Sequence, residues 1–243
     1  MAPTTRQRIV LGSLLASLTL NAAMVASLAQ SGGLRRILLR LDLVKPPSIR
    51  APFQVADEER FRLLPNTPAE VVFLGDSLIA DGPWAELYSD IHNRGIGGDR
   101  TDGVLARLDE VLAARPKVIL TLIGSNDLSA AVPAAQVVRN YRAILERIRR
   151  DCPATRVCVA ALLPVNQNMV GAPIYSNDQV RSVNEPLRSL VAEFPNAQFF
   201  DLLDLLRDDK GDLKAEYSKD GLHLNIKGYL AIAERIGTLV QAR

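Results

Sequence analysis

The fold is constrained most by short apolar runs that alternate with segments of helical periodicity. Apolar runs occupy residues 71–75, 91–96, 117–124, 156–163 and 197–202. Helical patterns follow at residues 83–89, 101–114, 133–150, 177–194 and 226–241. Strands that are apolar at consecutive positions are covered on both faces, and helical connections between them require parallel pairing. We therefore expect an α/β chain, folded as a three-layer α/β/α sandwich on a five-stranded parallel sheet.

The N-terminal region carries a membrane-targeting pattern. Ile9 to Ala29 is a run of 21 residues without a charge, preceded by Arg6 and Arg8. As a helix this run would extend about 30 Å, the thickness of a bilayer core. Residues 1–30 are thus expected to form an N-terminal hydrophobic helix that anchors the protein, with the folded domain outside the cytoplasm. Ser27-Leu28-Ala29 leaves open a cleaved signal and a secreted or periplasmic protein.

Residues 31–66 are expected to form a basic amphipathic segment and a proline-rich linker, and residues 67–243 the folded domain. Residues 1–66 hold nine Lys or Arg against four Asp or Glu, whereas residues 67–243 hold twenty against twenty-three. A nucleic-acid-binding protein is expected to place its positive charge on the folded domain. The charge distribution therefore argues against a nucleic-acid partner.

Polar and small residues follow the predicted strands. In parallel α/β sheets, ligands bind outside the carboxyl ends of the strands. The stretches at these positions are Gly75-Asp76-Ser77-Leu78, Gly95-Ile96-Gly97-Gly98-Asp99 and Gly124-Ser125-Asn126-Asp127, and Asp220-Gly221-Leu222-His223 precedes the last helix. Hydroxyl, amide, carboxylate and imidazole groups are thus expected to converge on one edge of the sheet.

These groups fit nucleophilic catalysis by a serine. The Ser77 hydroxyl needs a base to remove its proton, and the base must be oriented and its charge balanced. Asp220 and His223 are three residues apart, so one loop can present both side chains. Gly98 and Asn126 are placed to offer a backbone N–H and a side-chain amide to an oxyanion.

Each stretch also has an ordinary structural interpretation. Ser77 could cap a helix, and Asn126 could form a local turn. Arg100 breaks the G-x-G-x-x-G pattern of dinucleotide-binding proteins. The occurrence of all four stretches in order favours a catalytic site over these separate interpretations.

The four stretches together resemble the SGNH hydrolases, also called the GDSL esterase/lipase family. The resemblance covers about residues 68–241, with GDSL at 75–78, NRGIGGDRT at 93–101, GSND at 124–127 and DGLH at 220–223. It implies the flavodoxin-like SGNH fold, Ser77 as nucleophile, His223 as base and Asp220 as its orienting partner. It further implies an oxyanion hole formed by the N–H groups of Ser77 and Gly98 and by the Asn126 amide.

The second and third stretches look most like the branch of platelet-activating-factor acetylhydrolase catalytic subunits and bacterial carbohydrate esterases. We therefore expect an esterase that cleaves short-chain or acetyl esters of carbohydrates or lysophospholipids through an acyl-enzyme. A non-catalytic acyl-glycan binding module and an acyltransferase remain alternatives. No metal-ligand cluster is expected, because the chain has only two histidines, His92 and His223. The expected esterase mechanism needs no metal and no organic cofactor. The oligomeric state and the redox state of Cys152 and Cys158 stay open.

Overall fold

A computed structural model describes residues 51–63, 70–170 and 174–241, all within one compact unit spanning residues 47–243. Its sheet has five parallel strands in the order β2-β1-β3-β4-β5. The strands are β1 (Val71–Gly75), β2 (Ile91–Gly95), β3 (Val118–Leu122), β4 (Arg156–Ala160) and β5 (Ala197–Phe200). The expected five-stranded parallel sheet is confirmed.

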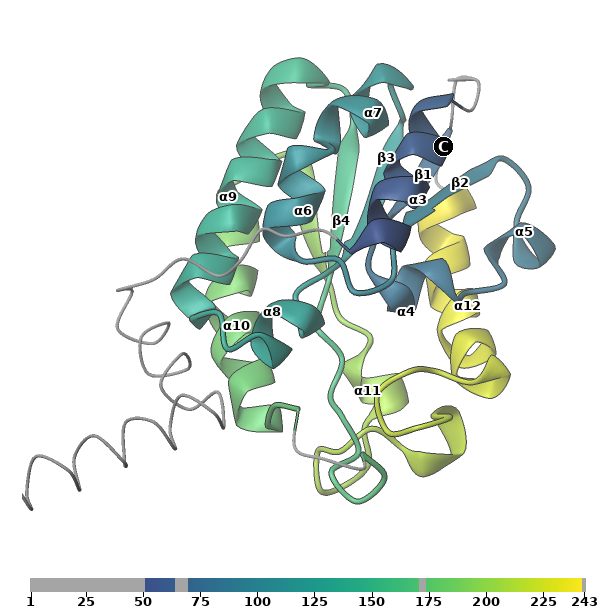
Figure 1. The fold of residues 1–243 in the computed structure, drawn as a ribbon, viewed down its shortest axis with the longest axis vertical. Coiled ribbons are helices and arrows are strands. Elements are labelled where there is room, and N and C mark those ends of the chain that lie inside the picture. Colours follow the sequence, from purple (N-terminus) through teal and green to yellow (C-terminus); the bar gives the residue numbers. More distant parts are fainter. Residues whose placement is uncertain (1–50, 64–69, 171–173, 242–243) are drawn as a thin grey trace, which may run out of the picture. The chain divides into compact units, whose positions relative to one another are not determined.

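Helices cover both faces of this sheet (Figure 1). One face carries α6 (Thr101–Ala106), α7 (Leu108–Ala113), α8 (Ser125–Ser129), α9 (Ala134–Asp151) and α10 (Asn177–Val191). The other carries α4 (Ser77–Ala80), α5 (Trp84–Leu87), α11 (Leu203–Leu206) and α12 (Ile226–Gln241), and the short 3-10 helix η1 (Ala215–Tyr217) precedes α12. Alternate strand residues face the two layers: Val72 and Leu74 pack on one side, Val71 and Phe73 on the other.

The chain leaves the neighbouring strands β1 and β3 toward opposite faces of the sheet. From β1 it passes through α4 and α5 on one face, and from β3 through α8 and α9 on the other. Such a switch opens a crevice beyond the carboxyl ends of neighbouring strands. Gly75, which ends β1, is in register with Gly95 of β2 and Leu122 of β3. The segments that follow these three residues therefore start from one edge.

The structure tests only part of what the sequence predicts for the N-terminal region. The proposed hydrophobic helix at residues 1–30 lies outside the described residues. Within the described ranges, no helix combines the length and apolar character that a bilayer crossing requires. Part of the expected linker differs: residues Pro52–Leu63 form helix α3, with Gln54 and Phe61 buried. Proline suits the first position of a helix, where its missing N–H costs nothing.

A buried guanidinium joins several segments at the carboxyl edge of the sheet. Arg107 donates from Nε to Asp99 Oδ2 at 2.9 Å, and both side chains are almost fully buried. Its terminal nitrogen also donates to the carbonyl oxygens of Gly75 at 3.2 Å and Arg94 at 2.9 Å. Arg107 therefore connects the end of β1, the end of β2 and the turn that follows β2.

Asp76 is a second buried ionisable group at this edge. Its Oδ1 accepts a hydrogen bond from the Leu78 N–H at 3.0 Å. Burial raises the pKa of Asp76 to about 7, and the nearby carboxylates of Asp99 and Asp127 add to the increase. The Asp76 carboxyl therefore keeps its proton up to near-neutral pH in the folded protein.

Replacing the buried guanidinium should strongly destabilise the domain. Arg107→Met removes the charged partner of Asp99, and breaking a buried pair in this way costs about 3–5 kcal/mol of unfolding free energy. Urea unfolding of the variant and wild type measures the loss. The exposed Arg139→Met on α9 is the matched control, expected within about 0.5 kcal/mol of wild type. Equal losses in both variants would contradict the role given to Arg107.

Asp76 should make stability depend on pH. Its pKa rises from 3.8 in the unfolded chain to about 7 on folding, so the folded state binds more protons between these values. Stability contributed by this proton is therefore lost as the pH rises through that range. Asp76→Asn lacks this titration, so the unfolding free energy of the variant minus that of wild type should be larger at pH 8 than at pH 5. Urea unfolding of both proteins at the two pH values measures this difference, and an equal difference at pH 5 and pH 8 would disprove the prediction.

Candidate active site

Ser77 lies where β1 ends and α4 begins. Asp76 caps this short helix by accepting the Leu78 N–H, and Ser77 is the first helical residue. The Ser77 Oγ lies 3.0 Å from Nε2 of His223, although 146 residues separate the two in sequence. The fold thus places a hydroxyl within hydrogen-bonding distance of an imidazole at the carboxyl edge of the sheet.

Asp220 holds both the ring and the backbone of His223. One carboxylate oxygen lies 2.6 Å from the His223 Nδ1. The other accepts the backbone N–H groups of Leu222 at 2.9 Å and His223 at 2.7 Å. Partial burial acts to raise the pKa of Asp220, but the hydrogen bonds from His223 and Leu222 outweigh it and hold the pKa below its usual range. An ionised Asp220 favours a proton on Nδ1, which leaves Nε2 as an acceptor for Ser77.

The loop that carries this pair is firmly anchored. Gly221 has φ +90°, and a Cβ there would lie 2.8 Å from the Val170 nitrogen and 2.9 Å from the Asn166 oxygen. The Asn166 N–H donates to the Gly221 carbonyl at 2.8 Å. Ser218 Oγ accepts the Gly221 N–H and donates to the His223 carbonyl, at 2.8 and 2.9 Å. Only glycine suits position 221, and the imidazole is held by its backbone as well as by its ring.

Gly98 lies in the turn after β2 and Asn126 at the start of α8, and hydrogen bonds join these two segments. Gly98 has φ +70° and is exposed, whereas Asn126 is the second residue of α8. One N–H of the Asn126 amide donates to the Asp99 carbonyl at 2.9 Å. The Asp127 carboxylate accepts from the Thr101 N–H at 2.9 Å and the Thr101 hydroxyl at 2.7 Å. These bonds fix Asn126 relative to the Gly98 turn.

The structure brings Ser77, His223 and Asp220 into one hydrogen-bonded row. Gly98 and Asn126 lie at the same edge of the sheet, on two segments joined by the hydrogen bonds of Asn126 and Asp127. The Asp127 carboxylate accepts both bonds from Thr101 and so joins the start of α8 to the start of α6, a role that its sequence position does not predict. Burial raises the pKa of Asp127 to about 6, against the opposing effect of the Thr101 hydrogen bonds. The supporting role of Arg107 was also missed, since one arginine in a helical pattern carries no signal of burial.

Other chemically notable side chains have structural roles. Trp84 is buried, donates to the Ile79 carbonyl at 2.8 Å and packs edge-on against Phe73 with ring centroids 4.9 Å apart. Cys152 and Cys158 are free and buried. Burial raises the pKa of the Cys158 thiol to about 11, which makes a reactive thiolate unfavourable.

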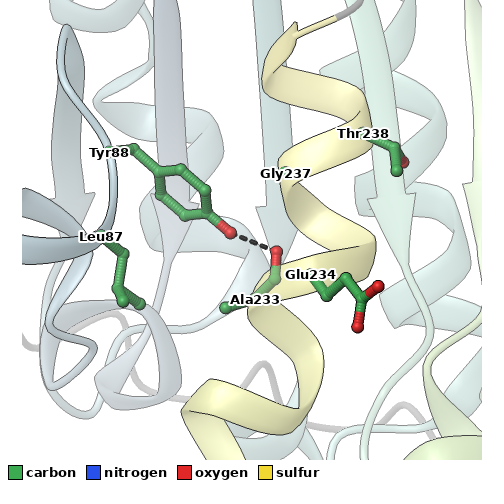
Figure 2. Close-up of a pocket in the computed structure, with 6 residues that line it drawn as sticks. All are labelled: Leu87, Tyr88, Ala233, Glu234, Gly237 and Thr238. Carbon is green, nitrogen blue, oxygen red and sulfur yellow. Dashed lines mark hydrogen bonds between the residues drawn. The ribbon is translucent and has the colours of Figure 1, made fainter.

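A hollow between α5 and α12 contains none of the residues expected to act in catalysis (Figure 2). Its lining residues are Leu87, Tyr88, Ala233, Glu234, Gly237 and Thr238. The Tyr88 hydroxyl donates to the Ala233 carbonyl, and burial raises the pKa of Tyr88 to about 12. Tyr88 is therefore a structural donor, and the hollow lacks the expected nucleophile and base that lie at the edge of the sheet near Ser77.

Comparisons with known proteins identify the family of this chain. The model of the GDSL-like lipase/acylhydrolase family matches residues 73–231. Platelet-activating factor acetylhydrolase IB subunit alpha1 of Rattus norvegicus is 35% identical over 179 residues, which are 70% of this chain and 75% of the relative. The human protein of the same name is also 35% identical over 179 residues, with the same shares covered.

Solved structures show the same fold. A Streptococcus pneumonia protein described as a candidate platelet activating factor superposes with a TM-score of 0.73 at 30% identity, over 90% of this chain and 99% of its own. The acetyl xylan esterase AlAXEase superposes with a TM-score of 0.59 at 18% identity, over 70% of this chain and 98% of its own. On the family match and the curated relatives, the chain belongs to the GDSL-like lipase/acylhydrolase family and is a hydrolase.

Proposed function

We propose that this protein is a serine esterase that cleaves short-chain or acetyl esters through an acyl-enzyme. The observation that carries the proposal is the row of hydrogen bonds from Ser77 through His223 to Asp220, with separations of 3.0 and 2.6 Å. A hydroxyl, an imidazole and an ionised carboxylate in this order supply a nucleophile, a base and a charge partner.

In the first half of the reaction, the Ser77 oxygen attacks the acyl carbon while its proton passes to Nε2 of His223. The resulting imidazolium is balanced by Asp220, whose lowered pKa keeps it ionised. The proton on Nε2 then passes to the departing alcohol as the carbon–oxygen ester bond breaks. In the second half, Nε2 takes a proton from water, whose oxygen attacks the acyl-enzyme, and the returned proton restores the Ser77 hydroxyl as the acid leaves.

The negative oxygen formed in each half needs preplaced donors. The proposed donors are the N–H groups of Ser77 and Gly98 and the side-chain amide of Asn126. Two observations support this assignment. The positive φ of Gly98 is a conformation that glycine adopts easily. The bond from Asn126 to the Asp99 carbonyl uses one hydrogen of the amide and fixes the amide plane, so the direction of its second N–H is fixed as well. A donor fixed before the reaction need not reorganise when charge develops.

The proposed substrates are acetyl or short-chain esters of carbohydrates or lysophospholipid-like molecules. The names of the rat relative and of AlAXEase both refer to removal of acetyl groups. Gly98 and Asp220 are exposed and Ser77 is partly so, which suits a shallow site that takes a small acyl group on a large alcohol. Hydrolysis rates for acetylated sugars, lysophospholipids and acyl thioesters would rank these classes.

A membrane location is also proposed, on the uncharged run Ile9 to Ala29 and its length alone. Such an anchor would hold the esterase near envelope glycans or lipids. Acyl transfer to a sugar hydroxyl would use the same side chains, with the alcohol replacing water in the second half-reaction. Product analysis with a competing alcohol acceptor separates transfer from hydrolysis.

Ser77→Ala should abolish ester hydrolysis. Loss of the nucleophile in this type of machinery lowers kcat by roughly 10⁴-fold or more. Hydrolysis of a chromogenic acetyl ester and labelling by a serine-directed fluorophosphonate measure the two properties. Wild type should hydrolyse the ester and be labelled at Ser77 by the fluorophosphonate, whereas the variant should neither hydrolyse the ester nor be labelled. Equal turnover by the variant would refute the esterase proposal, and an unlabelled, inactive wild type would favour a binding module.

Asn126→Ala should lower kcat with little change in KM, because an oxyanion donor acts on the transition state. The expected loss is about 10²–10³-fold in kcat. Asn140→Ala is the matched control, since Asn140 donates at 2.7 Å to the Thr101 hydroxyl, which itself bonds Asp127 beside Asn126. A control that lost as much kcat as Asn126→Ala would show that the reaction needs the hydrogen bonds that join these two segments, and not a donor at Asn126.

A further inference from the structure

Helix α3 buries a polar side chain beside the proposed oxyanion hole. Of the twelve residues in α3, Gln54 and Phe61 are buried. Burial of Phe61 is ordinary packing, with the guanidinium carbon of Arg94 4.8 Å from the ring centroid. Glutamine is mostly exposed in proteins, so its burial here calls for a specific contact.

Gln54 uses both ends of its amide. Its Oε1 accepts the backbone N–H of Ala51 at 2.9 Å, just before α3. Its Nε2 donates to the carbonyl oxygen of Gly97 at 3.0 Å, 43 residues away. Exchanging the amide oxygen and nitrogen would oppose donor to donor and acceptor to acceptor, so the two partners fix the orientation of the side chain.

The Gly97 carbonyl belongs to the same peptide unit as the Gly98 N–H. In a planar trans peptide the C=O and N–H bonds point in opposite directions. A hydrogen bond that fixes the Gly97 oxygen therefore fixes the direction of the Gly98 N–H, which points away from Gln54. Such a bond also polarises the peptide and strengthens its N–H as a donor.

The same side of the turn is closed by α3. A Cβ on Gly98 would lie 3.3 Å from Gln54 Nε2, and a Cβ on Gly97 would lie 3.8 Å from the ring of Phe53. Phe53 is 56% exposed, so its ring lies at the protein surface beside the turn. The start of α3 thus occupies the carbonyl side of the Gly97–Gly98 peptide and leaves the opposite side for the substrate oxygen.

We propose that Gln54 is a positioning residue for this esterase, acting through the Gly97 carbonyl to orient and polarise the Gly98 N–H toward the oxyanion. The inference rests on the proposed function and extends the active site to a helix upstream of the sheet. Gln54 acts on a donor that matters in the transition state, so its loss should lower kcat and leave KM nearly unchanged. Removing an oxyanion donor outright costs about 10²–10³-fold, so misorienting one should cost at least about tenfold.

The kinetic test compares two Gln54 variants of the full chain with a control on the same helix. Gln54→Glu keeps an acceptor for Ala51 and replaces the donor by an oxygen that repels the Gly97 carbonyl. Gln54→Met keeps the volume and removes both bonds. Phe61→Leu weakens the docking of α3 and leaves Gln54 intact. Both Gln54 variants should lose at least about tenfold in kcat on an acetyl ester, and Phe61→Leu should stay within about twofold.

A resonance of the Gly98 amide tests the contact without any substrate. The chain has two Gly-Gly pairs, Gly32-Gly33 and Gly97-Gly98. With glycine labelled by ¹³C at the carbonyl and by ¹⁵N, an experiment that correlates each amide with the preceding carbonyl yields signals from Gly33 and Gly98 alone. Gln54→Met should shift the Gly97 carbonyl and Gly98 amide signals and leave the Gly33 pair unchanged.

Unchanged kcat in both Gln54 variants would overturn the inference, as would an unchanged Gly98 signal or an equal loss in Phe61→Leu. Failure of the proposed function has a different signature, because the wild-type chain itself would then hydrolyse no ester. That result would also remove the catalytic role of Gln54, while the Gly98 signal would separately report whether the contact exists.

Discussion

The buried guanidinium of Arg107 is the interaction on which the geometry of the carboxyl edge depends. It donates to the carbonyls of Gly75, the last residue of β1, and of Arg94 in β2, and it neutralises Asp99 in the turn between β2 and α6. Parallel strands bring their ends to one edge, but they do not by themselves hold the following loops at fixed separations. A planar cation with several donors does so, because it bonds three segments at once.

The loops that would carry catalysis are joined by further bonds, each between segments distant in sequence. Asp127 bonds Thr101, Asn126 bonds the Asp99 carbonyl, and Gln54 bonds the Gly97 carbonyl. On the other side, Asp220 orients His223 through ring and backbone together. The proposed donors and base are thus held in place by the folded chain before any substrate arrives, which is the condition for electrostatic stabilisation of a transition state.

The strands and long helices were predictable because burial on both faces and helical periodicity leave patterns in sequence. All five apolar runs became strands, and the pattern at 177–194 became α10. Helices of four or five residues, such as α4 and α8, are too short to show a period. The prolines near residues 46–52 predict an extended linker, whereas residues Pro52–Leu63 form helix α3. The triad stretches could be found by residue type and order, whereas Arg107 and Gln54 act through backbone carbonyls and have no sequence signature.

The place of α3 in the fold bears on how the protein is divided for study. A fragment that begins at residue 67, where the proline-rich segment predicts that the linker ends, would retain Ser77, Asp220 and His223. It would nevertheless lack the Gln54 amide that bonds the Gly97 carbonyl and the Phe53 ring that lies beside the turn. If Gln54 acts as proposed, such a fragment would hold every residue of the family motifs and still hydrolyse esters slowly, and its rate would not represent that of the whole protein.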